Sequence, residues 1–177
     1  VLSMIVQRAI ERIGVPWRNG LGVQYEIACD GSLPDDWTWR LSTADITQDV
    51  PFSSFPLVTR EFCVADGNGV TLNINGVDHR CEPGSITKFR GDDVVAAALT
   101  DGPMQALNLM LRDGSTARPL QIARVGQHIV RCQVIVAIMG SASVEVANQV
   151  VELGLLDAII DLAGMDAVVH IGEVAAF

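Results

Sequence analysis

Positive charge is scarce in this sequence. Its 177 residues include 12 lysines and arginines against 21 aspartates and glutamates, which leaves a net charge of −9. A surface this acidic repels phosphate backbones and anionic lipids, so we expect neither nucleic acid nor a membrane as partner. No apolar run approaches the roughly 18 residues that a membrane-spanning helix needs. Because the first residues also lack a signal-peptide pattern, we expect a cytoplasmic protein.

Motifs for metal binding, redox chemistry and common catalytic mechanisms are also missing. A transition-metal site usually needs several imidazoles or thiolates close together, but there is no CxxC or HxH pair. The cysteines and histidines are Cys29, Cys63, Cys81, Cys132, His79, His128 and His170. The GxSxG, phosphate-loop and HExxH motifs are absent as well. We therefore expect reduced thiols, no metal and no cofactor.

Glycine and proline, by contrast, interrupt the chain at short intervals. The Asn75-Gly76 step is typical of a tight hairpin turn. In the segment before it, Val70, Leu72 and Ile74 alternate with polar residues, which is the pattern of a strand with one buried face. Many short strands separated by such turns predict an all-β protein, either a sandwich or a barrel.

The composition of the chain changes near residue 120. After Arg131 there is no lysine or arginine, and valine, isoleucine, leucine and alanine dominate. We therefore expect a first unit over residues 1–120 and a smaller second unit over residues 121–177. Periodicity leaves two segments open. Residues 5–13 fit a strand or one helical turn, and residues 148–163 fit one amphipathic helix or two strands.

Polar residues on strand faces that should be interior are the main functional signal. Arg40 lies between two apolar residues, and Ser42 follows on the same face of its strand. Asn108 lies between two leucines of another alternating segment. A buried arginine or asparagine without a partner is costly. These residues must therefore pair internally, for example with Glu26 or Glu61, or bind a small acid in a cavity.

Several segments resemble known families. The glycine-rich turn and strands of residues 67–76, followed by the Pro-Gly turn and strand of residues 82–92, resemble the cupin barrel pattern. The order and spacing of further segments across residues 15–114 resemble the HutD/Ves family. These segments are PWRNGLG at 16–22, WRLSTA at 39–44, PFSSFP at 51–56, FRGD at 89–92 and NLMLR at 108–112.

The resemblance implies a bicupin, in which one chain forms two jelly-roll-like β-barrel halves with little helix. It also favours strands in residues 148–163. Members of the family typically lack the metal-binding histidines of cupins. The family resembles a product of bacterial histidine-utilisation genes, which implies a modulator that binds a small acidic intermediate of the formylated-glutamate type. We therefore expect a metal-independent protein that binds a small carboxylic acid.

On this hypothesis Arg40 is the anchor, because a guanidinium group can bind a carboxylate through two parallel hydrogen bonds. Ser42 and Asn108 would give directional hydrogen bonds to the ligand. The other expected site residues are Arg18 and Asn19 at the cavity mouth, Arg112 as a second positive charge, and Trp17 and Trp39 as walls.

Two other functions stay open at this point. An enzyme acting on such an acid needs a general base, for which Glu26 is the candidate. No activated nucleophile lies beside Glu26 in the sequence. A protein-interaction module without a small ligand would instead use the acidic, apolar second half, either as a strand edge or as the face of a homodimer.

Overall fold

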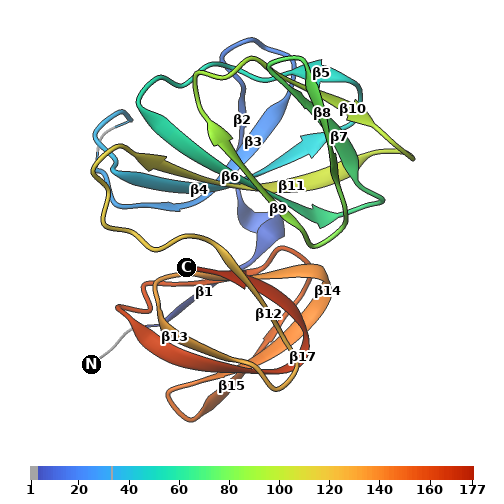
Figure 1. Cartoon of the computed structure of the whole chain (residues 1–177). Helices are drawn as coiled ribbons and strands as arrows, with labels where there is room; N and C mark the ends of the chain where they lie inside the picture. The colour runs from blue at the N-terminus through green and yellow to red at the C-terminus, as the bar shows by residue number, and fades with distance from the viewer. Residues whose placement is uncertain (1–3, 33) are drawn as a thin grey trace. The chain divides into compact units, whose positions relative to one another are not determined.

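The computed structural model describes residues 4–32 and 34–177, and almost all of its regular secondary structure is β (Figure 1). Among these residues the one helical element is η1 (Ala9–Glu11), a single 3₁₀ turn. No helix in the described part of the chain has the length and apolar character needed to cross a membrane. The predicted all-β class is confirmed.

The chain divides into two compact units. Residues 13–117 form the N-terminal unit, and residues 118–177 form the C-terminal unit together with the described part of residues 1–12. The first strand, β1 (Ile5–Gln7), pairs antiparallel with β16 (Ala158–Ile160). Val6 packs against the apolar core of that unit. The predicted first unit of residues 1–120 therefore differs from the structure at its start, because the opening strand pairs with the far end of the chain.

The N-terminal unit consists of two antiparallel sheets. One has six strands in the order β2-β3-β4-β11-β6-β9, and the other has four in the order β5-β10-β7-β8. The strands are β2 (Gly14–Pro16), β3 (Val23–Cys29), β4 (Trp39–Ile46), β5 (Val50–Pro51), β6 (Val58–Asp66), β7 (Val70–Ile74), β8 (Val77–Cys81), β9 (Ile86–Arg90), β10 (Val95–Leu99) and β11 (Met104–Arg112). Buried apolar side chains from both sheets form one core, which includes Phe62, Leu72 and Ala106.

The hairpin between β7 and β8 has the predicted turn. Asn75 and Gly76 both have positive φ angles, of 51° and 87°. Two such residues in succession are typical of the turn whose twist matches a two-residue hairpin, and glycine adopts this backbone without steric cost. His79 is exposed on β8, as expected for a hairpin residue in contact with solvent.

The C-terminal unit contains a seven-stranded sheet with the path β1-β16-β14-β17-β12, in which β13 also pairs with β17 and β15 with β14. Its remaining strands are β12 (Gln121–Arg124), β13 (His128–Cys132), β14 (Ile135–Val146), β15 (Gln149–Leu153) and β17 (Met165–Ala176). The ambiguous residues 148–163 thus form strands β15 and β16. Residues 5–13 form both a strand and a helical turn, β1 and η1.

Candidate ligand-binding site

Three adjacent strands of the six-stranded sheet bring the polar residues of the site together. In β4, β11 and β6, residues directly opposite one another project to the same face of the sheet. Two successive rows of this kind are Arg40–Met110–Arg60 and Ser42–Asn108–Phe62. Phe62 is fully buried in the core of the unit. The polar side chains therefore point into the interior of the barrel, as the alternation in the sequence predicts for Arg40, Ser42 and Asn108.

A cavity of about 650 Å³, counting open solvent at its mouth, lies over this face within the N-terminal unit. Its lining combines four aromatic rings and three other apolar residues with eight polar or charged residues, so apolar walls and hydrogen-bonding groups converge there, as in small-molecule sites. The lining residues are Pro16, Trp17, Arg18, Gln24, Asp35, Trp37, Arg40, Ser42, Ala44, Phe52, Ser53, Phe55, Arg60, Asn108 and Met110.

Arg60 is the most deeply buried cation of the cavity, with an exposed fraction of 6%. Its Nη2 donates to Asn108 Oδ1 at 3.0 Å, and its Nη1 donates to the carbonyl oxygen of Ser53 at 3.5 Å. Its Nε is buried and has no hydrogen-bond partner, and the same is true of Ser53 Oγ. None of the ion pairs among the described residues involves Arg60. The wall of the cavity therefore contains two buried polar atoms whose hydrogen-bonding capacity is unused.

Aromatic rings hold the guanidinium group of Arg60 in place. Its Cζ lies 5.0 Å from the ring centroid of Phe52, 5.1 Å from that of Phe89 and 5.8 Å from that of Phe55. These contacts are favourable cation–π interactions. Burial lowers the pKa of Arg60 to about 10. The guanidinium group therefore remains positively charged at neutral pH.

Arg40, the predicted anchor, also lines the cavity, but the structure corrects the expectation that it is unpaired. Its Nε donates to Glu26 Oε2 at 2.8 Å. Glu26 lies opposite Ser42 in the β3–β4 ladder, beside a bulge, so its side chain projects beside Arg40 on the same face. The internal pair with Glu26, one of the two alternatives open from the sequence, is the arrangement that forms.

Glu26 is not positioned as a general base inside the cavity. Its side chain has an exposed fraction of 46%, and it is absent from the residues that line the cavity. Besides Arg40, it contacts the thiol of Cys29, whose Sγ lies 3.6 Å from Glu26 Oε1. The one carboxylate in the lining is Asp35, which lies exposed at the mouth. The catalytic alternative therefore lacks its proposed base where a substrate would lie.

Arg18, expected at the cavity mouth, and Trp17, expected in its wall, both line the cavity. Arg18 Nη2 lies 3.7 Å from Asp35 Oδ1, and its guanidinium lies 4.9 Å from the ring centroid of Phe55. The ring of Trp17 meets that of Phe52 edge to face, with centroids 6.0 Å apart. Both Arg18 and Asp35 are largely exposed, so this ion pair contributes little stability.

Three predicted site residues do not line the cavity. Asn19 Oδ1 accepts from the Leu21 amide at 3.1 Å within a local turn, and its Nδ2 donates to the distant carbonyl of Pro51 at 3.0 Å. Arg112 donates to the backbone carbonyl of Asp35 at 2.8 Å and lies over the ring of Trp37. Trp39 alternates with Arg40 along β4, so it projects to the opposite face of the sheet.

Sequence reasoning missed Arg60, Ser53 and the two phenylalanines at positions 52 and 55. The signal for Arg60 was present, because Arg60, Phe62 and Val64 occupy one face of β6 and the latter two are fully buried. A charged residue on such a face marks either an internal ion pair or a site. The segment that carries Ser53 was noticed only as part of a family motif.

The donor set of the cavity suits an anion better than a metal ion. Its lining contains no histidine or cysteine and a single carboxylate. Across residues 4–32 and 34–177, no group of three or more histidines, cysteines, aspartates or glutamates is arranged to hold a metal. Guanidinium, amide and hydroxyl groups instead provide donors for a carboxylate.

Comparison with known sequences identifies relatives of this chain. A sequence model of the HutD family matches residues 11–174. Protein Ves from Citrobacter koseri is 36% identical over 109 residues, which make up 60% of this chain and 57% of that protein. The chain thus matches little more than half the length of this curated relative.

Comparison with solved structures extends the likeness over the whole chain. HutD from Pseudomonas fluorescens SBW25, in a formate condition, is 30% identical, with a TM-score of 0.82. The match covers 98% of this chain and 96% of that one. A cupin 2 conserved barrel domain protein from Leptotrichia buccalis superposes over 99% of this chain and 94% of its own, with a TM-score of 0.60 and 11% identity. With the two β units, these likenesses confirm the predicted bicupin fold.

Proposed function

Since this chain belongs to the HutD family, we propose that its N-terminal unit binds a small carboxylic acid, without a metal, in the cavity beside Arg60. The anchor moves from Arg40 on β4 to Arg60 on β6, two strands further across the sheet. Ser42 and Asn108 keep the roles expected from the sequence, as polar groups that orient the acid.

The observation that carries this proposal is the unpartnered Nε of Arg60. Leaving a buried donor unsatisfied costs about 1–3 kcal/mol, and more when the group is charged. A carboxylate in the cavity would accept from Nε and from a neighbouring Nη, which is the bidentate geometry that arginine favours. The hydroxyl of Ser53, also unpartnered, can donate to the same ligand.

The surroundings of Arg60 strengthen such an interaction. Phe52, Phe55 and Trp37 line the cavity beside it and exclude water from the guanidinium. In a setting of low effective dielectric, an ion pair is stronger than in water. Since Arg60 is already fixed by Asn108 and the aromatic rings, little conformational entropy is lost when a ligand binds.

Family membership supports a place in histidine utilisation. We propose an intermediate of the formylated-glutamate type as the natural ligand, and modulation of that pathway as the outcome of binding. A cytoplasmic location follows from this proposal.

Isothermal titration calorimetry with formylglutamate, formiminoglutamate and urocanate tests the site. We expect Arg60→Met to weaken any acid that binds by about 100-fold, the order of effect of removing a buried, hydrogen-bonded charge. Arg124→Met is the control, because Arg124 is an exposed arginine of the C-terminal unit paired with Glu173. Unchanged affinity in Arg60→Met would overturn the proposal.

A further inference from the structure

The second cation of the cavity, Arg40, is occupied by a side chain that can move away. Arg40 itself has an exposed fraction of 17%, whereas its partner Glu26 has one of 46%. Arg40 lines the cavity and Glu26 does not. An exposed glutamate can rotate into solvent at small cost, but the half-buried arginine is held by the surrounding barrel. The anion, and not the cation, is therefore the mobile member of this pair.

The sheet places the two arginines at opposite ends of one row. Arg40, Met110 and Arg60 lie directly opposite one another on neighbouring strands β4, β11 and β6. Adjacent strands are about 4.8 Å apart, so the two arginine backbones are separated by roughly 10 Å. Met110 provides an apolar floor between them. This arrangement matches a short apolar chain with a carboxylate at each end.

From these observations we propose that Glu26 is an internal competitor for Arg40, displaced when a dicarboxylate binds and left in place when a monocarboxylate binds. The inference rests on the proposed function, because it takes Arg60 as the anchor of the first carboxylate. The second carboxylate of the ligand replaces Glu26 at Arg40. Glu26 thus sets how strongly the cavity prefers dicarboxylates over monocarboxylates.

The size of the effect follows from the population of the paired state. A ligand that must displace an internal partner binds with reduced affinity. Its apparent affinity is its intrinsic affinity multiplied by the fraction of molecules in which Arg40 is already free of Glu26. A partly exposed ion pair is worth up to about 1 kcal/mol, so its removal raises affinity roughly two- to fivefold. Only an acid that reaches Arg40 gains by this factor.

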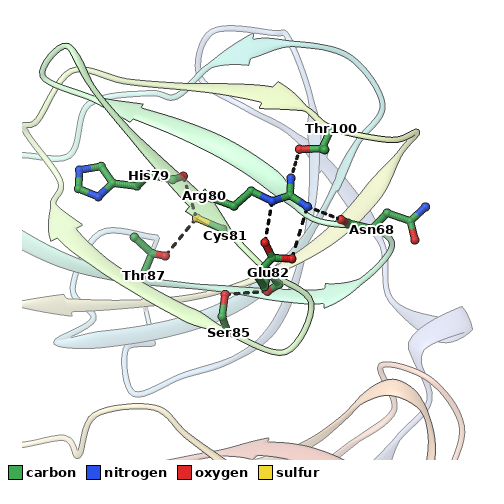
Figure 2. A network of polar contacts seen from close by, with 8 residues as sticks. All are labelled: Asn68, His79, Arg80, Cys81, Glu82, Ser85, Thr87 and Thr100. Carbon is green, nitrogen blue, oxygen red and sulfur yellow. Dashed lines mark hydrogen bonds and ion pairs between the residues drawn. The ribbon is translucent and has the colours of Figure 1, made fainter.

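A second pair in the same unit provides a matched control. Arg80 Nε lies 2.9 Å from Glu82 Oε1, and its Nη2 lies 3.4 Å from Glu82 Oε2 (Figure 2), so this is also a partly exposed arginine–glutamate pair. Arg80 also contacts Thr100 and the carbonyl of Asn68, and neither Arg80 nor Glu82 lines the cavity. Glu82→Gln removes the same charge as Glu26→Gln but leaves the site unaltered.

The experiment compares glutarate with pentanoate, which differ only in the terminal carboxylate, by calorimetry. We expect Glu26→Gln to raise glutarate affinity roughly two- to fivefold and to leave pentanoate affinity unchanged, since only glutarate displaces the partner of Arg40. Arg40→Met should reduce glutarate affinity to the level of pentanoate. Glu82→Gln should alter neither.

The two proposals fail in distinguishable ways. Equal changes for both acids in Glu26→Gln, or no change for glutarate, would overturn the competitor role of Glu26 whatever Arg60 does. Binding of both acids by Arg60→Met with unchanged affinity would overturn the anchor role. Loss of both acids in Arg60→Met, with a glutarate-specific gain in Glu26→Gln, supports both proposals.

Discussion

The two units of the chain use buried charge in opposite ways. In the C-terminal unit, the Asp157 carboxylate accepts from Arg8 Nη1 at 2.7 Å, from the Ala9 amide at 2.8 Å and from the Gly154 amide at 2.9 Å. In the N-terminal unit, Arg60 is buried to a similar degree, but its Nε has no partner. Burial of charge alone therefore does not mark a site, and our proposal rests instead on unused hydrogen-bonding capacity beside a cavity.

The difference follows from where each residue lies in its unit. Asp157 joins Arg8 and Ala9 near the start of the chain to Gly154 after β15, so all its partners belong to the fold of the C-terminal unit. Arg60 projects into a cavity, where Asn108 and the backbone of Ser53 use only part of its donor set. If Asp157 stabilises the fold and Arg60 does not, replacing the two charges should have opposite effects on stability.

The largest expected effect is the loss of the Asp157 network. Asp157→Ala leaves Arg8 and two backbone amides without their acceptor, and we expect a loss of about 3–5 kcal/mol in the free energy of unfolding. Glu152→Ala, an exposed carboxylate of the same unit, should change it by less than about 0.5 kcal/mol. Urea denaturation measures both. Equal losses of stability in the two variants would show that the Asp157 network does not stabilise the fold more than an exposed carboxylate does.

A smaller effect of opposite sign is expected at Arg60. Replacing a buried charge that lacks a carboxylate partner by an apolar side chain of similar length often leaves stability unchanged or raises it. Arg60→Met should therefore keep or increase the free energy of unfolding of the empty protein, by about 1 kcal/mol, while ligand binding is lost. Denaturation without ligand measures this. A loss above about 2 kcal/mol would make Arg60 a structural residue.

The smallest expected effect is in the pH dependence of the C-terminal unit. Despite burial, which raises it, the pKa of Asp157 lies below its ordinary value of 3.8, because two backbone amides and Arg8 stabilise the carboxylate. A lowered pKa in the folded state means that this stabilisation is present above about pH 4 and is lost as the pH falls through the folded value.

Measuring the free energy of unfolding of wild type and Asp157→Asn from about pH 6 to about pH 2 tests this direction of the pH dependence. The difference in free energy of unfolding between the two proteins should become smaller toward the low-pH end of this range. A difference that stays constant over that range would show that the Asp157 carboxylate is not stabilised by ionisation.

Much of the fold was predictable because its signals are local. The turn at Asn75-Gly76 and the alternation in β4 and β11 depend on residues a few positions apart, and the structure has them as expected. Residues 148–163 were ambiguous because short apolar runs fit a helix or strands equally well, and pairing with β14 decides the outcome. The docking of β1 on β16 joins segments about 150 residues apart and leaves no local signal.

The candidate site was predictable only in part, for the same reason. Ser42 and Asn108 were found from alternation within single strands, and they lie opposite one another in the sheet. Arg60 was missed because its importance depends on two facts about distant residues. No carboxylate is paired with it, and the segment with Phe52, Ser53 and Phe55 lies beside it in the cavity wall.

The amino-acid sequence by itself determined an all-β chain, the positions of its turns, and the placing of arginine, serine and asparagine side chains on interior faces, because each depends on neighbouring residues. Only the tertiary structure decided which arginine is neutralised and which keeps an unused donor. Arg40 is paired because a bulge in β3 brings Glu26 beside it. Arg60 is not, because within the described residues strand pairing brings no aspartate or glutamate side chain into an ion pair with it. Strand pairing sets both outcomes, and composition does not.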